Sequence, residues 1–476
     1  MKQREARKMK RRAFVTWTAG ALASPVSSLL GQRATTPAAN KATAVGTIIS
    51  RSSRRPQVRI LLRSSWQSID TGDVAHTPGA LRLIERHIPG AQVTLWPSPN
   101  KFSDATRAML ARNFPLLRFA EGDIDADGKP TTPELAAAWD ADFFLHSSAT
   151  SLSAQAHLTA WRKATGRPYG IYSITVDPVS FFTGGSNIEG NSLTELRREV
   201  ESPEVRPLDG ARRQIFDEAS FVYCRDSLSL GYLRQQKVKT PVLGFGPDTA
   251  FSWDIKNLEK ADAWLSQVGL EAGRFLCIVP RLRYTPYHLE YKLEPTPVDL
   301  RKKAVSDRWV NVDTGKLREV ATRWVRETGM KVALIPEFPN QIDVSRDWIF
   351  AKLPADVRAS VAVRDTHWSP DEQSGVMSRA RVAVSLECHS PMLALAHGVP
   401  TIYLRQPTDT IKGQMWVDLN FGDWFADIDS VTSDDIWQKV RNIHNQHAAA
   451  VERAHAFMRK TRELQNQLWG KGTIHP

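Results

Sequence analysis

The sequence is poor in cysteine. Its 476 residues include three cysteines, which are odd in number and far apart: Cys224, Cys277 and Cys388. No two of them have the close spacing of a zinc-binding motif, and their number and spacing do not suggest a disulfide framework. Each lies in or beside an apolar stretch, so we expect three buried, reduced thiols.

Long apolar runs and common catalytic motifs are absent as well. Beyond the first 31 residues no segment is long and apolar enough to span a membrane. The chain contains no Gly-x-Ser-x-Gly, no His-Glu-x-x-His, no Asp-x-Asp pair at the end of an expected strand, no dinucleotide-binding glycine fingerprint and no phosphate-binding P-loop. The motifs therefore predict neither a metal site nor a bound cofactor.

The folded part of the chain carries almost no net charge. Residues 1–55 contain twelve Lys or Arg and one Glu, a net charge of +11 out of the total of +12, so residues 56–476 carry +1. A hydrophobic content of 42% and 15 tryptophans indicate a well-packed globular protein. The basic charge belongs to the N-terminal segment, so it does not indicate a nucleic-acid partner for the folded part.

The N-terminal segment has the pattern of an export signal. A basic stretch ends at Arg11-Arg12 and precedes a mildly apolar run that reaches Leu30. We expect residues 1–31 to be a twin-arginine-like signal and residues 32–56 a linker, which predicts an exported or periplasmic protein. The alternatives are that this segment is a disordered basic tail or results from a misplaced start codon. In either case we expect a cytoplasmic protein at the inner face of the membrane.

The remainder alternates between short apolar runs and helical patterns, which predicts parallel α/β sheets. We expect one Rossmann-like domain over residues 57–255 and a second over 256–432. The amphipathic spacing after Ser433 predicts one or two long helices over residues 433–476. The expected strands are Val58–Leu62, Gln92–Trp96, Phe143–His146, Tyr169–Val176, Ser220–Cys224, Phe275–Val279, Lys331–Ile335, Val361–Val363, Val382–Leu386 and Thr401–Leu404.

The most informative stretch is ARVAVSLECHSPMLALAHGVPTIYLR, residues 380–405. It predicts a buried strand, a turn that contains Glu387 and His389, a helix that starts near Pro391 and a further strand. Ligands of open parallel sheets bind at the carboxyl ends of the strands. Glu387 and His389 are therefore leading site candidates.

This stretch resembles the polysaccharide pyruvyl transferase family, whose signature is Arg-Leu-His, a helix of small residues and Gly-Val-Pro. Two further segments agree with the family pattern: Phe-Val-Tyr-Cys-Arg-Asp-Ser at 221–227, followed by Val-Leu-Gly-Phe-Gly-Pro-Asp-Thr-Ala-Phe at 242–251, and the Gly-Asp turn within Ser68–Pro78. The resemblance covers most of residues 60–430. It implies a GT-B-like fold: two Rossmann-like parallel-sheet domains that face a cleft, with a long C-terminal helical segment.

The resemblance also implies a reaction. A pyruvyl group would pass from phosphoenolpyruvate, the donor substrate, to two hydroxyls of a sugar in a cell-surface glycan, as in exopolysaccharide biosynthesis. The family's Arg-Leu-His is Glu387-Cys388-His389 here, so the arginine is replaced by an acid. An anionic donor needs cationic partners, so Arg379, Arg381 or Arg405 substitutes, or the ligand differs.

Three groups of site residues follow. We expect His389, Glu387 and Arg225 to be catalytic, and the acceptor to contact the aromatic loop after Phe275–Val279, through Tyr284, Tyr287 and His288. The residues predicted to bind the donor are Arg225, Asp73, His76, Asp248, Arg281 and Arg283.

Each of these residues also has a structural interpretation. His389 and Glu387 could cap the helix at Pro391, and Arg225 could pair with Asp226 or Asp217. Asp248 could cap the segment that follows it, and the Arg281–His288 loop could be a solvated basic loop. Thr77 is expected to cap a helix over Pro78–His87.

Two other functions remain open at this point. The same architecture serves glycosyltransferases that use a nucleotide sugar. A non-catalytic, exported glycan-binding protein would agree with the altered triplet and with export away from cytoplasmic phosphoenolpyruvate. The oligomeric state is not predicted.

Overall fold

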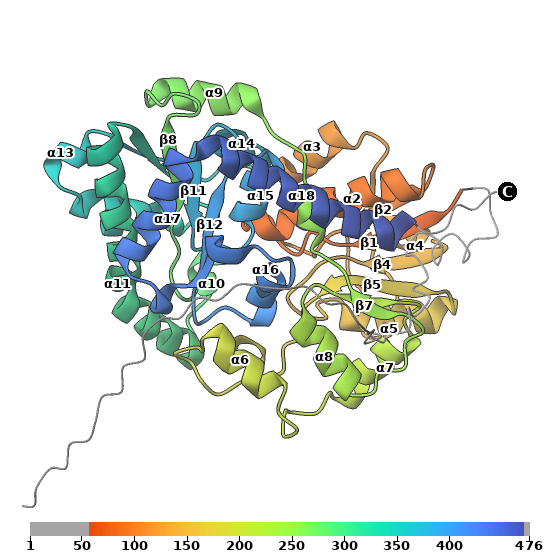
Figure 1. Ribbon diagram of the computed structural model, residues 1–476. Helices are drawn as coiled ribbons and strands as arrows, with labels where there is room; N and C mark the ends of the chain where they lie inside the picture. The colour runs from red at the N-terminus through yellow and green to blue at the C-terminus, as the bar shows by residue number, and fades with distance from the viewer. Residues whose placement is uncertain (1–56, 471–476) are drawn as a thin grey trace, which may run out of the picture. The chain divides into compact units, whose positions relative to one another are not determined.

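The computed structural model describes residues 57–470. These residues form two parallel β-sheets, and Figure 1 shows helices around both. The first sheet has the order β3-β2-β1-β4-β5-β6-β7 and the second has the order β10-β9-β8-β11-β12-β13. The strands of the first sheet are β1 (Arg59–Arg63), β2 (Gln92–Trp96), β3 (Arg118–Phe119), β4 (Phe143–His146), β5 (Tyr169–Ile174), β6 (Val222–Cys224) and β7 (Leu243–Phe245).

The second sheet is built from the chain after Leu258. Its strands are apolar and largely buried, as expected where helices cover both faces of a parallel sheet; all five residues of Phe275–Val279 are buried. The strands are β8 (Phe275–Val279), β9 (Lys331–Leu334), β10 (Val361–Val363), β11 (Val382–Ser385), β12 (Thr401–Arg405) and β13 (Phe425–Asp427). The two sheets and the long C-terminal helices confirm the predicted GT-B-like architecture.

Most helices connect successive strands, and the last two follow the final strand, β13. Those that follow strands of the first sheet are α2 (Thr71–His87), α3 (Asp104–Asn113), α4 (Pro133–Ala138), α5 (Gln155–Thr165), α6 (Leu193–Val200), α7 (Gly210–Glu218), α8 (Ser227–Gln235) and the 3₁₀ turn η2 (Thr249–Ser252). Those of the second half are α9 (Leu258–Gln267), α10 (Tyr287–Glu290), α11 (Pro297–Thr328), α12 (Gln341–Asp343), α13 (Ala355–Arg358), α14 (Pro370–Met377), α15 (Ser390–Ala396), the 3₁₀ turn η5 (Ile411–Gly413), α16 (Gln414–Asp418), α17 (Ser433–Asn445) and α18 (His447–Gly470).

The strand order of each sheet reverses at one point. In the first sheet the reversal lies between β1 and β4, and in the second between β8 and β11. The chain leaves neighbouring strands in opposite directions there, which opens a crevice at their carboxyl ends. The loops that follow β1, β8 and β11 therefore border the two crevices.

Helix α2 begins earlier than predicted. It starts at Thr71 rather than Pro78, because Asp70 is the N-cap and its carboxylate accepts a hydrogen bond from the Gly72 amide at 2.8 Å. Thr77 does not cap; its hydroxyl bonds those of Ser64 (2.8 Å) and Ser65 (2.7 Å). The predicted Gly72-Asp73 loop is therefore the first turn of a helix.

The pattern of residues over Lys316–Thr328 predicts a helix. Helix α11 contains that segment but begins earlier, at Pro297. A capping box of Thr296 and Asp299 begins the helix, with proline in its first turn. The result is a 32-residue helix along the second half.

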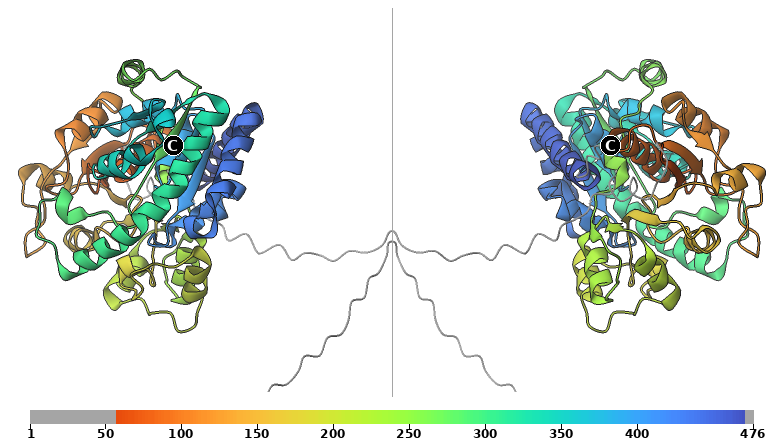
Figure 2. Two further views of the ribbon diagram at one scale, coloured as in Figure 1. Left: turned by 90° about the vertical axis from the view of Figure 1, so that its left-hand side faces the viewer. Right: turned by 90° about the vertical axis from the view of Figure 1, so that its right-hand side faces the viewer.

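The last helix, α18, returns to the first half of the chain (Figure 1). Gln465 donates a hydrogen bond to the Asp248 carbonyl at 2.8 Å, and Arg462 donates one to the Phe251 carbonyl at 3.1 Å. The Trp469 ring packs edge-on against Tyr172. Figure 2 shows α17 and α18, in dark blue, along one side of the fold.

The cysteines are free and buried, as predicted. Within residues 57–470 no helix has both the length and the apolarity that crossing a bilayer requires. The predicted signal and linker, residues 1–56, lie outside the described residues, and so do the last six residues of the C-terminal helical segment.

Candidate functional site

A cavity of about 100 Å³ lies between the two halves, at the carboxyl ends of their strands. The first half contributes the residues around the start of α2 and two loops. The second half contributes the loops that follow β8, β11 and β12. Its polar lining residues are Asp70, Asp73, Thr150, Arg281, Arg283, Tyr284, Thr285, Tyr287, Lys302, Glu387, His389, Thr408, Asp409, Thr410 and Lys412.

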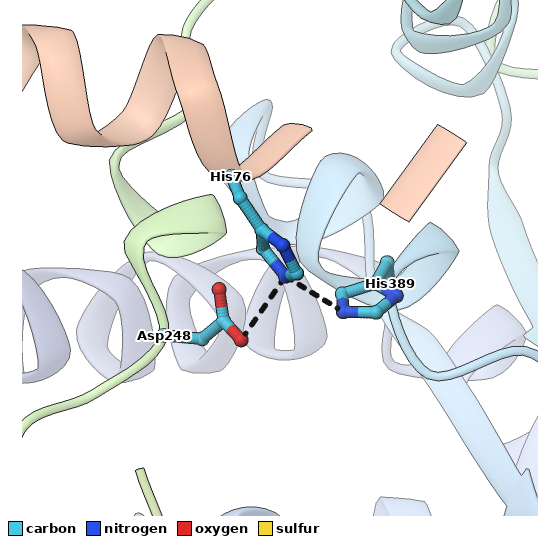
Figure 3. A group of neighbouring side chains, drawn as sticks. All are labelled: His76, Asp248 and His389. Atoms are coloured by element: carbon cyan, nitrogen blue, oxygen red, sulfur yellow. Dashed lines mark hydrogen bonds and ion pairs between the residues drawn. The ribbon is translucent and has the colours of Figure 1, made fainter. Parts of the chain in front are cut away.

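His389 lines the cavity and also belongs to a buried polar network with His76 and Asp248, which Figure 3 shows. Its Nε2 lies 3.2 Å from Nε2 of His76, which in turn lies 3.4 Å from Asp248 Oδ2. Asp248 Oδ2 also accepts a hydrogen bond from Arg225 Nη1 at 2.6 Å. A line of four side chains therefore runs from the cavity wall into the first half.

The position of His389 depends on a glycine. A Cβ atom at Gly72 would lie 2.0 Å from His389 Nδ1, so no other residue fits there without displacing the imidazole. Gly72 belongs to the first turn of α2, and His389 precedes α15. The Gly-Asp turn and the histidine turn, which the sequence marked separately, are thus packed against each other.

The network holds His389 neutral. Burial, and then the neighbouring His76, lower the pKa of His389 to about 3. Burial by itself would raise the pKa of Asp248, but His76 and Arg225 together hold it well below its usual range. At neutral pH the line therefore contains one ionised carboxylate with a guanidinium beside it, and a neutral imidazole at the cavity.

Alternating charges line the second half of the cavity. Arg281 lies 2.6 Å from Asp409 Oδ1 and 3.2 Å from Glu387 Oε1. Lys412 Nζ lies 3.8 Å from Asp409 Oδ1, beyond hydrogen-bond distance. Burial by itself would lower the pKa of Lys412, but Asp409, Cys388 and Glu387 together raise it above its ordinary value, so the ammonium stays charged.

Three buried carboxyl groups, those of Asp73, Glu337 and Glu387, lie near these cations. Burial and the neighbouring Asp70 raise the pKa of Asp73 to about 6 and that of Glu337 to about 8. Burial likewise raises the pKa of Glu387 well above its usual range, although Arg281 opposes this. Weak acids and cations thus share one enclosed space.

The structure places seven of the predicted site residues on the cavity wall: Asp73, Arg281, Arg283, Tyr284, Tyr287, Glu387 and His389. Four others do not line it. His76, expected to be open to the cleft, is fully buried behind His389, and Arg225 and Asp248 are fully buried behind His76. His288 is not among the lining residues either.

The structure shows which of the capping and ion-pairing contacts considered for Asp248, Arg225, His389 and Glu387 are formed. Asp248 caps η2 through the Ala250 amide, and Arg225 pairs with Asp248 rather than with Asp226 or Asp217. His389 occupies the N-cap position of α15 but makes no side-chain cap bond. Glu387 accepts a hydrogen bond from Gln341 at 2.6 Å and does not cap the helix.

None of the three arginines considered as replacements for the family's arginine lines the cavity. Arg379 pairs with Asp262, Arg381 bonds His444, and Arg405 pairs with Asp427. The cation beside Glu387 is Arg281 instead.

Sequence reasoning missed several residues of this site: Asp70, Glu337, Asp409 and Lys412. Asp409 and Lys412 follow β12 and Glu337 follows β9, so each comes after a strand's carboxyl end. The rule that selected Glu387 and His389 would have found them if it had been applied to every predicted strand.

No protein-family model matches the chain, and no curated protein matches it. Solved structures with a similar fold include a UGT transferase from Siraitia grosvenorii in complex with UDP, with a TM-score of 0.48, 12% identity, and coverage of 87% of this chain and 99% of the other. UDP-GlcNAc 2-epimerase from Neisseria meningitidis has a TM-score of 0.47, 10% identity and coverage of 87% and 99%. ADP-heptose LPS heptosyltransferase II from E. coli has a TM-score of 0.46, 12% identity and coverage of 82% and 100%. All three TM-scores lie below 0.5, so the chemistry of this chain has to be inferred from its own site.

Proposed function

We propose that this protein is a glycosyltransferase that moves a sugar from a nucleotide-sugar donor to a hydroxyl of a glycan. One observation supports the proposal most strongly. Cationic side chains and carboxylates that can accept hydrogen bonds from sugar hydroxyls line the same cavity between two parallel sheets. A nucleotide sugar presents both a diphosphate and a ring of hydroxyl groups, and so needs both kinds of partner.

The phosphates would be held by the second half. Lys412 Nζ makes no contact closer than 3.8 Å with its carboxylate partner, so its protons are available to a ligand. Arg281 contacts the same carboxylate, Asp409, and Lys302 and Arg283 also line the cavity. Charge-assisted hydrogen bonds from such groups to phosphate oxygens are the strong ones.

The acceptor hydroxyl needs a base, and Asp73 is better suited than His389. Both nitrogens of His389 face protein groups, Nε2 toward His76 and Nδ1 toward Glu337. Asp73 lines the cavity, and its pKa of about 6 leaves it largely ionised at neutral pH yet basic enough to accept a proton. Tyr284 and Tyr287 also line the cavity and bring aromatic rings to it.

Pyruvyl transfer from phosphoenolpyruvate is the second candidate, and the size of the cavity favours it. A volume of about 100 Å³ suits a compact donor, whereas drug-sized ligands occupy roughly 300 Å³ or more. Against it, the carboxylate of Glu387 faces the cavity in place of the family's arginine, and Arg225 is turned away into the protein. Phosphoenolpyruvate offers no hydroxyl group for these carboxylates to bind.

The test is a thermal-shift titration of the full chain with UDP- and ADP-sugars and, in parallel, with phosphoenolpyruvate. A ligand that binds the folded state raises the melting temperature by mass action. We expect a saturable rise with one nucleotide sugar that Lys412→Met weakens by about tenfold to 100-fold. Lys163→Met, at an exposed position of α5, is the matched control.

The other outcomes discriminate between the alternatives. A rise with phosphoenolpyruvate alone would replace glycosyl transfer by pyruvyl transfer. No response to either donor would favour the exported glycan-binding protein. Asp73→Asn should keep donor binding and lose turnover, and full turnover in that variant would exclude Asp73 as the base.

A further inference from the structure

We propose that His389, Glu337 and Asp70 bind a divalent cation of the Mg²⁺ or Mn²⁺ type beside the cavity. One ligand atom from each of the three residues lies within 4.8 Å of the others. The site goes beyond the transferase proposal, because it stands on ligand geometry alone and does not depend on the identity of the donor.

Glu337 supplies the observation that points to a ligand. Its side chain is 1% exposed, and its Oε1 has no hydrogen-bond partner among the described residues. The other oxygen, Oε2, accepts hydrogen bonds from the amide and the hydroxyl of Ser390, which fix the carboxylate. A buried carboxylate oxygen without a partner is costly, and a cation would satisfy it.

The neighbouring ligand atoms are suitably oriented. His389 Nδ1 lies 3.8 Å from Glu337 Oε1, too far for a hydrogen bond. Two ligands that each lie about 2.1 Å from one ion are separated by roughly 3 to 4.2 Å, so this pair fits a shared ion. The other nitrogen of His389 is held by His76, which keeps Nδ1 directed at the site.

Asp70 is the third proposed ligand, and it lies where an ion can reach the site from the cavity. One of its oxygens accepts the cap bond from the Gly72 amide, which leaves the second for an ion. Asp70 and His389 both line the cavity, so an ion can enter from it. Two carboxylates and one imidazole suit Mn²⁺ or Mg²⁺.

A second group of possible ligands, His76, Asp248 and His389, is less suitable. Its ligand atoms already contact one another, with His76 Nε2 between the other two. Asp248 is also paired with the buried Arg225, whose positive charge opposes a cation. The structure therefore favours the Glu337 side of His389.

Electron paramagnetic resonance of Mn²⁺ tests the site directly, since free and bound Mn²⁺ differ in signal. After treatment with a chelator, the full chain is expected to bind one Mn²⁺. Glu337→Gln should raise the dissociation constant at least tenfold, and so should Asp70→Asn, in which asparagine still caps α2. Glu319→Gln, the same chemical change at an exposed position of α11, should leave binding unchanged.

Absence of stoichiometric Mn²⁺ binding by the unsubstituted chain would overturn the proposal. Binding that is unchanged in both Glu337→Gln and Asp70→Asn would also overturn it. If Glu337→Gln fails to fold, Asp70→Asn decides the question alone, because its cap is retained. Since the readout is bound metal, failure here is distinct from failure to bind a nucleotide sugar.

Discussion

The carboxyl edges of the two sheets carry similar charged residues and use them differently. At the first sheet Arg225, Asp248 and His76 are fully buried and contact one another. At the second sheet Arg281 and Lys412 line the cavity, and within residues 57–470 the carboxylate paired with the Lys412 ammonium, Asp409, is 3.8 Å away. The comparison separates charges that hold the protein together from charges that are available to a ligand.

The largest effect should come from Arg225→Met. The substitution leaves the Asp248 carboxylate buried without its guanidinium partner, so the free energy of unfolding should fall by about 3–5 kcal/mol. Urea denaturation followed by circular dichroism measures this. If Arg225 instead served mainly to bind a ligand, stability would be nearly unchanged.

The double variant Arg225→Met/Asp248→Asn is the control for that experiment. Asp248→Asn removes the buried carboxylate that Arg225→Met would leave without a partner. The loss in the free energy of unfolding should therefore be smaller in the double variant than the sum of the losses in the two single variants. Strict additivity would mean that the two side chains are not coupled.

Gly72→Ala tests the contact between the two edges. The added methyl group would overlap the His389 imidazole, and we expect a loss of about 1–3 kcal/mol together with weaker ligand binding. Gly210→Ala is the matched control, since a Cβ there meets no atom within 4 Å. Equal melting temperatures for the two variants would contradict the packing described here.

His146, at the end of β4, gives the first edge a pH dependence. Burial, and then the nearby Arg63, lower its pKa to about 3. In the unfolded chain the pKa of His146 is about 6.5, so between pH 6.5 and 3 the unfolded state binds more protons than the folded state. The contribution of His146 to the free energy of unfolding is therefore fully present above pH 6.5 and is lost as the pH falls through this range. The effect of His146 alone should lower the free energy of unfolding by about 2 kcal/mol between pH 7 and pH 5.

His146→Gln, which cannot be protonated, provides the comparison. Denaturation at pH 7 and at pH 5 should show a shallower loss in this variant than in the unsubstituted chain. Parallel pH profiles would mean that other groups account for the acid sensitivity.

The smallest effect is expected from Arg379→Met. Arg379 pairs with Asp262 at the surface and is remote from the cavity lining. Such exposed pairs contribute about 0–1 kcal/mol, and donor affinity should not change. Loss of donor affinity would restore Arg379 as the replacement for the missing family arginine and would weaken the assignment to Lys412.

Much of the fold was predictable because its signals are local. The strands Gln92–Trp96, Phe143–His146, Phe275–Val279 and Val361–Val363 have the predicted bounds. Short apolar runs between polar turns are distinctive in buried parallel sheets. The start of α2 was mispredicted, because Pro78 was interpreted as the first residue of the helix although Asp70 caps it seven residues earlier.

The site was predictable only in part. His389 and Glu387 follow a strand end, and the strand-end rule placed them at the cavity correctly. The same rule suggested that Arg225 faces a ligand, whereas its side chain turns inward to Asp248. Sequence position determines that a residue lies at the edge of a sheet, but not the direction in which its side chain points.

The sequence by itself determined the alternation of strands and helices, the division into two sheets, the terminal helices and the histidine turn, because each rests on the periodicity of nearby residues. Only the tertiary structure decided which charges face the cavity, since this depends on contacts between distant parts of the chain. His76 and His389 are 313 residues apart and meet through their Nε2 atoms. Glu337 and Ser390 come from different strand ends of one sheet, and their contact leaves one carboxylate oxygen without a partner. Such contacts are set by the packing of whole sheets, which no local pattern records.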